Sequence, residues 1–311
     1  MINRRIILAG GSGFLGSCLT NYLRKNHFEV LCLTRSKANA PGFVQWDPPH
    51  MGPWYKNLDG AAALINFSGR PVDCRPTKKN RMEILRSRVQ SIVTLAEAIR
   101  KCENPPLAWI QASSAAIYGD KNENDCTEST HAGEGFAVDV CKRWEKEFQL
   151  QRLEQVRKVT LRIGLVLAAN GGALQRLARL TEMGLGSPAG NGQQYMSWIH
   201  HVDFCRIVQW CVENHLAQGV YNVSAPSPVT NSEFMKQLRT LLGRRVYVPA
   251  PGVLVRLASV VLRTDPSLIL AGRKCLPQRL IDLGFQFDHP ELPETLEEIL
   301  AKESQASFKI G

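Results

Sequence analysis

The chain lacks any long hydrophobic run, and this absence argues against a membrane protein. A transmembrane helix needs roughly 18–20 consecutive apolar residues, and no stretch of the sequence approaches that length. Residues 1–11, MINRRIILAGG, also lack the hydrophobic region and the small-residue cleavage site of a signal peptide. We therefore expect a cytoplasmic protein that does not interact with membranes.

The sequence also lacks the cysteine patterns of a metal site. It contains nine cysteines, but none forms a Cys-x-x-Cys pair, and no cysteine–histidine cluster has zinc spacing. We expect no bound metal. In a reducing compartment most of these cysteines act as small hydrophobic side chains.

A long basic stripe is missing as well, although the formal net charge is +10. The basic residues are dispersed, and the clusters are as short as Lys78-Lys79-Asn80-Arg81. No nucleic-acid-binding motif is present, so we expect no nucleic-acid partner. The charge is compatible with a basic cleft that attracts an anionic small molecule.

Short apolar runs alternate with amphipathic stretches over the first 165 residues. Strands are predicted at 5–10, 29–34, 62–67, 107–114 and 159–167, and helices at about 14–25, 79–101 and 135–152. Strands that alternate with helices indicate βαβ units and a parallel sheet. The strands are almost continuously apolar, which indicates that both faces of the sheet are covered. The predicted fold class is α/β, a Rossmann-type doubly wound parallel sheet.

The pattern changes beyond residue 170. A Gly-rich segment is followed by a strand-like stretch at 219–225 and then by helices separated by Pro and Gly. We expect residues 1–170 to form the nucleotide-binding domain, to which 198–225 return. Residues 171–197 and 226–311 then form a smaller substrate or lid lobe.

The segment GGSGFLG carries the strongest chemical signal. It follows a predicted strand and opens a predicted helix, which is the context that a dinucleotide-binding fingerprint requires. The glycines allow a tight turn and close approach of the backbone to a pyrophosphate, and the helix N-terminus favours negative charge. The predicted cofactor-binding residues are Gly10, Gly11, Ser12, Gly13, Phe14, Leu15 and Gly16.

The end of the second predicted strand distinguishes between the two nicotinamide dinucleotides. It reads Thr34-Arg35-Ser36, where an NAD site usually carries an acidic residue for the ribose hydroxyls. A carboxylate would repel a 2′-phosphate, whereas an arginine beside a hydroxyl can bind one. We therefore expect NADP(H) as the cofactor.

Ordered motifs along nearly the whole chain resemble the short-chain dehydrogenase/reductase superfamily. The match is to its atypical NAD-dependent epimerase/dehydratase-like branch, the "epimerase family protein" group, which has a C-terminal module of the DUF1731 type. The resemblance rests on GGSGFLG, LINFSG, SRV, ASSAAIYG, CKRWE, LRIGLVLAANGGAL, GNGQQYMSWIHHVD, YNVSAPSPVTNSEF and LPQRLIDLGFQF.

The resemblance implies a catalytic serine but not the usual proton relay. In the superfamily a Tyr and a Lys four residues later act with a Ser at the end of the preceding strand. Ser114 matches that Ser, whereas Ala137 and Cys141 stand at the Tyr and Lys positions. Arg88 stands where a helix Asn is usual, and it either replaces the missing cation or, as we favour, binds the cofactor.

Cys141 remains open to several interpretations. A thiol cannot supply the cation that lowers a tyrosine pKa. It could act as an acid, a nucleophile or a redox-sensitive group, and the helix start and the following Lys142 and Arg143 could favour the thiolate. A thiol that merely packs beside the nicotinamide is the interpretation we favour. Tyr118 is a spare phenol that either reaches the reacting centre or is structural.

The resemblance also implies several residues in the walls of the site. Further predicted cofactor-binding residues are Phe67, Ser68, Gly69, Glu83, Arg88, Arg162 and Val166, the last of which could equally belong to the core. Gln194 and Trp198, in a Gly-rich loop, are candidate substrate contacts. Asp203 is predicted to be the N-cap of a helix, which leaves metal or acid–base roles for His200 and His201 disfavoured.

Two functions remain open at this stage. The first is an NADP(H)-dependent oxidoreductase or epimerase-like enzyme that acts on an unidentified small molecule. The second is a catalytically inactive NADP(H)-binding redox sensor or scaffold protein. C-terminal helices predicted at about 253–262, 266–272 and 293–302 serve either as a substrate lid or as the surface of a homodimer.

Overall fold

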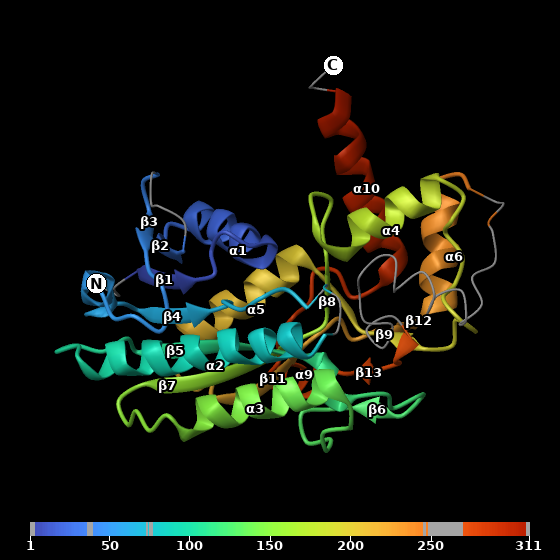
Figure 1. Ribbon diagram of the computed structural model, residues 1–311. Coiled ribbons are helices and arrows are strands. Elements are labelled where there is room, and N and C mark those ends of the chain that lie inside the picture. The colour runs from blue at the N-terminus through green and yellow to red at the C-terminus, as the bar shows by residue number, and fades with distance from the viewer. Residues whose placement is uncertain are drawn as a thin grey trace.

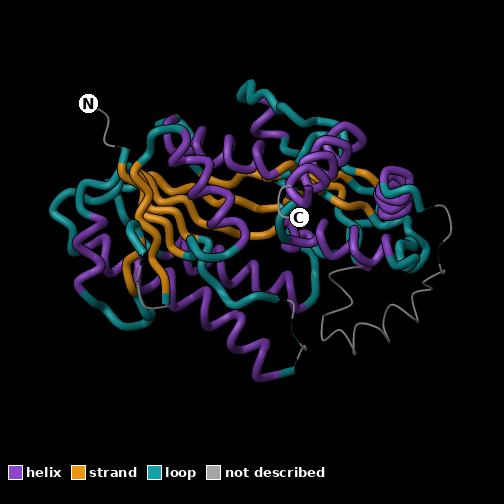
Figure 2. Tube along the Cα trace, turned by 90° about the horizontal axis from the view of Figure 1, so that it is seen from above, coloured by secondary structure: helices purple, strands orange, loops and turns teal. Residues whose placement is uncertain are grey.

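A seven-stranded, entirely parallel sheet forms the centre of the protein, with the strand order β11-β7-β5-β4-β1-β2-β3. The computed structural model describes residues 4–35, 40–72, 74, 77–244, 247 and 270–308. The strands, in sheet order, are β11 (Gly219–Val223), β7 (Arg157–Ile163), β5 (Ala108–Ser114), β4 (Ala63–Asn66), β1 (Arg5–Ala9), β2 (Glu29–Thr34) and β3 (Phe43–Gln45). Figure 2 shows the strands lying between two layers of helices. The predicted doubly wound α/β fold is confirmed.

The apolar sequences of the strands explain why the sheet is the core. Ile6, Ile7 and Leu8 of β1 have no exposed surface, and all four residues of β4 are buried. Each fully buried Ile or Leu side chain stabilises the fold by about 1.5–3 kcal/mol. Because both faces are covered, the central strand β1 shows no polar–apolar alternation.

Four helices cover the two faces of the sheet (Figure 1). The helices α1 (Phe14–Lys25) and α5 (His201–Glu213) pack together on one face, and α2 (Lys78–Arg100) and α3 (Phe136–Leu150) pack together on the other. The hydroxyl of Thr77 accepts a hydrogen bond from the N–H of Asn80 and so caps α2. Two 3₁₀ turns, η1 (Pro53–Leu58) and η2 (Ala115–Tyr118), follow strands.

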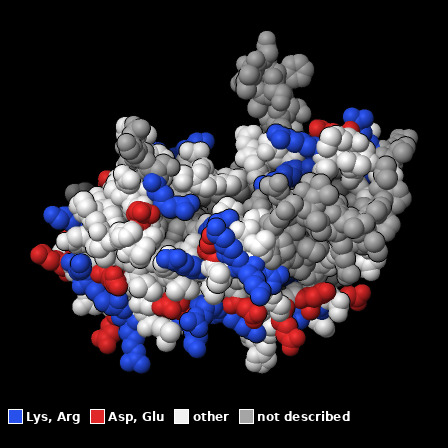
Figure 3. All heavy atoms as spheres, viewed as in Figure 1, with Lys and Arg blue, Asp and Glu red and all other residues white. Residues whose placement is uncertain are grey.

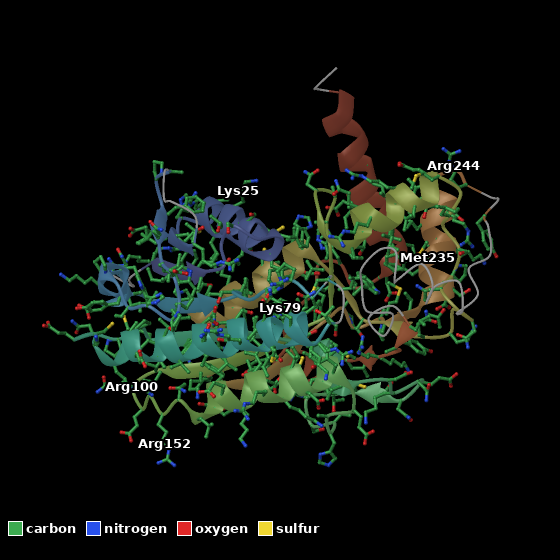
Figure 4. All side chains as sticks on the ribbon, viewed as in Figure 1. Lys25, Lys79, Arg100, Arg152, Met235 and Arg244 are labelled. Carbon is green, nitrogen blue, oxygen red and sulfur yellow. The ribbon has the colours of Figure 1, made fainter. Side chains whose placement is uncertain are left out.

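A second, smaller core lies beyond the carboxyl end of the sheet. It is formed by α4 (Gly172–Glu182), α6 (Asn231–Leu241) and α10 (Leu292–Phe308), together with the short strands β8 (Leu165–Leu167), β9 (Tyr195–Met196), β10 (Trp198–His200) and β12 (Val229–Thr230). Met235, labelled on α6 in Figure 4, belongs to this core. A capping box between Thr230 and Glu233 begins α6.

Strands from beyond residue 200 pair with strands from the first 165 residues. The strand β13 (Lys274–Cys275) pairs in parallel with β6 (Asp125–Cys126), and α9 (Gln278–Asp282) follows it. The strand β11 lies at the edge of the main sheet. The predicted division into domains nevertheless stays a prediction.

The predicted strand 159–167 is wrong as a single element. It is two strands, β7 and β8, that separate at Gly164, and β8 pairs with β10 instead of continuing the sheet. A Cβ atom at Gly164 would lie 2.5 Å from the carbonyl oxygen of Ser197. The glycine therefore permits the close backbone approach that diverts the chain out of the main sheet.

The predicted N-cap of α5 is also wrong. The cap is His200, whose Nδ1 accepts a hydrogen bond from the N–H of Val202 at 3.3 Å. Asp203 lies within the helix with no exposed surface. Its carboxylate accepts hydrogen bonds from the N–H groups of Asp288 at 3.0 Å and His289 at 2.8 Å, so it anchors the segment before α10.

The remaining predictions concern the C-terminal helices and the surface. The helix predicted at 293–302 corresponds to α10, whereas 253–262 and most of 266–272 lie outside the described residues. Among the helices in the described ranges, none combines the length and apolarity required to cross a membrane. Basic and acidic side chains are interspersed on the face shown in Figure 3.

Candidate functional site

The order of the strands places a crevice between β1 and β4. The chain runs outward from β1 to β3 and then crosses to β4 on the other side of β1, and ligands bind at such a switch point in open α/β sheets. A cavity of about 340 Å³ lies there. Its walls include the predicted cofactor-binding residues Gly10, Ser12, Gly13, Thr34, Arg35, Phe67, Ser68 and Gly69.

The glycines of the first turn are required by close packing. Gly10 has φ +85°, and a Cβ atom there would lie 2.8 Å from the backbone of Phe67. A Cβ atom at Gly16 would overlap the carbonyl oxygen of Gly10, and one at Gly11 would lie 2.5 Å from the Sγ of Cys32. These three glycines therefore bring the turn against β2, α1 and the end of β4.

Gly13 differs from the other glycines because it has free space in front of it. A Cβ atom there would meet only the carbonyl oxygen of Gly10, at 3.6 Å. Gly13 is the N-cap of α1, and no side chain caps the helix or places a negative charge in its first turn. The cradle therefore fits a pyrophosphate, which can approach the backbone N–H groups and the positive end of the helix dipole.

Arg35 stands at the exposed end of β2 and lines the cavity. It also lines a neighbouring hollow of about 620 Å³, together with Arg70 and Arg86. Ser36, its predicted hydroxyl neighbour, lies outside the described residues. The position after β2 thus carries a cation, which matches a phosphate better than a ribose hydroxyl pair.

The helix α2 fixes the loop that follows β4. The guanidinium of Arg70 is paired with the carboxylate of Glu83 and donates to Asn80 at 3.1 Å. Ser87 accepts a hydrogen bond from the N–H of Arg70 at 2.9 Å. Arg88 donates a hydrogen bond to the carbonyl oxygen of Arg70, also at 2.9 Å. Glu83 therefore faces Arg70 of this loop, and its predicted role towards the cofactor would be exerted through that residue.

A second, smaller cavity brings the candidate reacting groups together. It has a volume of about 80 Å³, and Ser114, Ala137, Cys141 and Arg88 all line it. The rest of its lining is mainly apolar and includes Phe136. Ser114 ends β5 and Cys141 lies on α3, so the sheet and the helix position these groups independently.

Ser114 is available to donate a hydrogen bond into this cavity. Its Oγ accepts a hydrogen bond from the N–H of Ala116 at 3.2 Å and caps η2. Because the oxygen acts as the acceptor in that bond, the hydroxyl hydrogen can still rotate towards a ligand. A hydroxyl at this place can bind a carbonyl oxygen.

The environment of Cys141 disfavours the thiolate. Its side chain is only 3% exposed. Burial raises the pKa of Cys141 to about 12, and the nearby Glu145 raises it further, although Arg88 opposes both effects. The suggestion that the helix start and the following basic residues favour a thiolate is therefore wrong, because desolvation dominates.

Tyr118 and Arg162 belong to a buried network behind α3. The hydroxyl of Tyr118 donates to Asn222 at 2.7 Å and accepts from Arg162 at 3.0 Å. Burial raises the pKa of Tyr118 to about 12, which Arg162 partly opposes. Val166 is buried in the main core. This arrangement favours structural roles for the three residues.

The two candidate substrate contacts lie in the walls of the second core. Trp198 has no exposed surface, and its indole N–H donates to the carbonyl oxygen of Ser227 at 3.0 Å. Gln194 is partly buried and donates to the carbonyl oxygen of Ala189 at 2.9 Å. Packing of the lobe accounts for both positions, and contact with a substrate remains a prediction.

The family of the chain follows from comparison with known proteins. Residues 6–224 match the model of the NAD dependent epimerase/dehydratase family, and residues 250–299 match a domain of unknown function, DUF1731. The chain belongs to the NAD dependent epimerase/dehydratase family.

Relatives from distant organisms match the chain from end to end. The human epimerase family protein SDR39U1 is 32% identical over 302 residues, which cover 96% of this chain and 100% of the relative. The Bacillus subtilis epimerase family protein YfhF is 32% identical over 95% of this chain and 98% of its own. A crystal structure of human SDR39U1 with NADPH superposes with a TM-score of 0.84 and 31% identity, covering 95% of this chain and 98% of that one.

Sequence reasoning missed Arg70, after β4, because no local motif signals its role. It also disfavoured a metal or acid–base role for His200, whose ligand-type atom lies within 4.8 Å of those of His289 and Glu298. His200 is remote in sequence from the other two residues, and only the tertiary fold brings the three together.

Proposed function

We propose that this protein is an atypical short-chain dehydrogenase/reductase, an NADP(H)-dependent oxidoreductase or epimerase-like enzyme that acts on an unidentified small molecule. The observation that carries the proposal is the single cavity shared by the glycine turn and Arg35. The human relative crystallised with NADPH supports the choice of nucleotide.

The residues of the crevice have separate binding roles in this proposal. The N–H groups after Gly13 bind the pyrophosphate, and Arg35 binds the 2′-phosphate with a charge-assisted hydrogen bond. Thr34 and the segment Phe67–Gly69 line the same crevice and would contact the adenosine. The loop that carries Arg70 holds its shape through Glu83 and Arg88.

The smaller cavity is the place of the reaction. A bound nicotinamide supplies or accepts the hydride. Ser114 would donate a hydrogen bond to the carbonyl oxygen of the substrate, which orients the substrate while the hydroxyl keeps its proton, and the apolar walls limit the access of water. Cys141, which remains a protonated thiol at neutral pH, packs beside the reacting groups.

We further infer that the usual Tyr–Lys relay is absent. Ala137 and Cys141 occupy the corresponding places on α3, and both line the cavity. Neither can hold a phenolate or supply a fixed cation. This observation favours a second candidate function, a catalytically inactive sensor or scaffold that reports the NADP(H) redox state.

Calorimetric titration with NADPH, followed by a screen of carbonyl compounds at the NADPH absorbance, tests the proposal. We expect binding of NADPH and substrate-dependent oxidation that Ser114→Ala abolishes without weakening NADPH binding. Ser113→Ala is the matched control. The hydroxyl of this neighbouring serine donates to Glu145 at 2.6 Å, and Ser113 does not line the smaller cavity. The control variant should therefore keep its turnover. Binding of NADPH without turnover in either direction across the screen would favour the sensor.

A further inference from the structure

Cys126 and Cys275 lie directly opposite each other on the paired strands β6 and β13, which run side by side in Figure 1. The N–H of Leu276 donates to the carbonyl oxygen of Cys126 at 3.0 Å. The preceding residues of the two strands, Lys274 and Asp125, form an ion pair at 2.9 Å. The register of the strands is therefore fixed on both sides of the two cysteines.

The spacing of the two strands fits a disulfide bond. Neighbouring strands of a sheet lie about 4.8 Å apart, and the Cα atoms of bridged cysteines lie about 4.4–6.8 Å apart. Residues that are paired directly across two strands project to the same face of the sheet. Cys126 and Cys275 accordingly belong to one buried cluster, which also contains Cys141.

The two thiols of the pair differ in acidity. A hydrogen bond from Cys275 lowers the pKa of Cys126, and the positive charges of Lys121 and Arg273 act in the same direction, against the effect of burial. The same contact, together with burial, raises the pKa of Cys275 well above its ordinary value. Cys126 is therefore the nucleophile of the pair, and Cys275 is the thiol that stays protonated.

Solvent lies one residue away from the two cysteines. Cys126 and Cys275 have no exposed surface, but the side chains of Asp125 and Lys274 are 52% and 32% exposed. Each of the two strands is only two residues long, and a ladder with so few hydrogen bonds opens locally at low cost. A molecule as small as hydrogen peroxide can therefore reach the thiols.

We infer that Cys126 and Cys275 form a site of reversible oxidation, at which a peroxide joins β6 to β13 through a disulfide bond. The Cys126 thiolate attacks one oxygen of hydrogen peroxide, and the O–O bond breaks as the sulfenic acid forms. The hydroxide that leaves takes up the proton that Cys126 has lost. The Sγ of Cys275 then attacks the oxidised sulfur, and the sulfenic hydroxyl leaves as water with the proton of Cys275. The peroxide thus accepts two electrons, and a thiol reductant reverses the bond.

Treatment of the full chain with hydrogen peroxide, followed by digestion without reductant and mass spectrometry, tests the inference. Trypsin together with a glutamate-specific protease separates Cys126 from Cys141, because Glu128 and Glu134 lie between them. We expect a pair of peptides linked through Cys126 and Cys275 that dithiothreitol separates. The oxidised protein should melt about 5 °C higher than the reduced protein, because the bond closes a long loop of the chain.

Cys211, which is also fully buried, provides the matched control. Burial raises the pKa of Cys211 to about 12, so its thiol should be lost at least about 10-fold more slowly than those of the pair. Cys211→Ala should leave the link between Cys126 and Cys275 unchanged. Cys275→Ala should stop the oxidation of Cys126 at the sulfenic acid, which dimedone captures.

Three results would overturn the inference: a link through Cys141, sulfinic acid at Cys126 without a link, or loss of the paired thiols no faster than that of Cys211. The inference does not depend on the proposed function, because neither cysteine of the pair lines the nucleotide crevice. Oxidation should accordingly leave the affinity for NADPH unchanged. Failure of the reduced protein to bind NADPH would contradict the proposed function alone.

Discussion

The carboxylate of Glu145 and the guanidinium of Arg162 form a two-point ion pair, with Oε1–Nε and Oε2–Nη2 distances of 3.0 and 2.9 Å. Ser113 donates a third hydrogen bond to the same carboxylate. The pair joins α3 to β7 behind Cys141. It therefore fixes the wall of the cavity that carries Ala137 and Cys141.

Glu145→Gln should destabilise the protein by about 3 kcal/mol, because it leaves a largely buried arginine without its counter-charge. The two side chains are only 13% and 11% exposed. Urea unfolding measures the change, and Glu154→Gln on the surface should alter the free energy of unfolding by less than about 0.5 kcal/mol. Equal stability of the two variants would show that the pair contributes nothing.

Gly13→Ala and Gly16→Ala should separate binding from folding. A methyl group at Gly16 overlaps the backbone of Gly10, whereas one at Gly13 has room. We expect Gly16→Ala to lower the melting temperature and Gly13→Ala to leave it nearly unchanged. Gly13→Ala should nevertheless weaken NADPH binding, because its methyl group fills the approach of the pyrophosphate. Unchanged NADPH affinity of Gly13→Ala would contradict the placement of the pyrophosphate at this turn.

Cys141 should resist alkylation in the folded protein at pH 8 and react once the protein is unfolded. Its folded-state pKa of about 12 lies above the ordinary value of 9.0. The stability that it contributes is therefore complete below pH 9 and is lost as the pH rises from 9 towards 12. Iodoacetamide labelling followed by mass spectrometry tests the first expectation. Rapid labelling of the folded protein would contradict the protonated thiol.

The loss of stability with pH can be measured separately. The free energy of unfolding of the wild type should fall more steeply above pH 9 than that of Cys141→Ala, because the variant lacks this titrating thiol. Urea unfolding at a series of pH values provides the comparison. Identical slopes would show that Cys141 titrates alike in the folded and unfolded states.

Asp203→Asn should destabilise the fold by about 2–4 kcal/mol, since this fully buried carboxylate accepts two backbone hydrogen bonds and pairs with Arg206. Asp282→Asn, at an exposed position of α9, is the control. Because Asp203 holds the segment before α10, hydrogen exchange at Asp288 and His289 should accelerate in the variant. Unaltered exchange there would contradict the anchoring role.

The main sheet could be predicted from the sequence because its signals are local. Continuous apolar runs give the buried strands, and GGSGFLG gives the first turn and helix. Gly164 was not recognised as a break, because only the carbonyl oxygen of Ser197, remote in sequence, makes the glycine necessary.

The environment of the site was harder to predict than its position. Ser114 and Cys141 were expected near each other, and they line one cavity. The burial that raises the pKa of Cys141 depends on the surrounding tertiary packing, and the helix start and neighbouring lysine suggested the reverse.

The affinities of the wild type and of Arg35→Glu for NADPH and for NADH test the central claim most directly. Calorimetry should show that the wild type binds NADPH more tightly than NADH, and that the substitution weakens NADPH binding by about 1.5–3 kcal/mol with a much smaller effect on NADH. Equal losses for both nucleotides, or a wild type that binds neither, would contradict the assignment of a phosphorylated adenine ribose to this crevice.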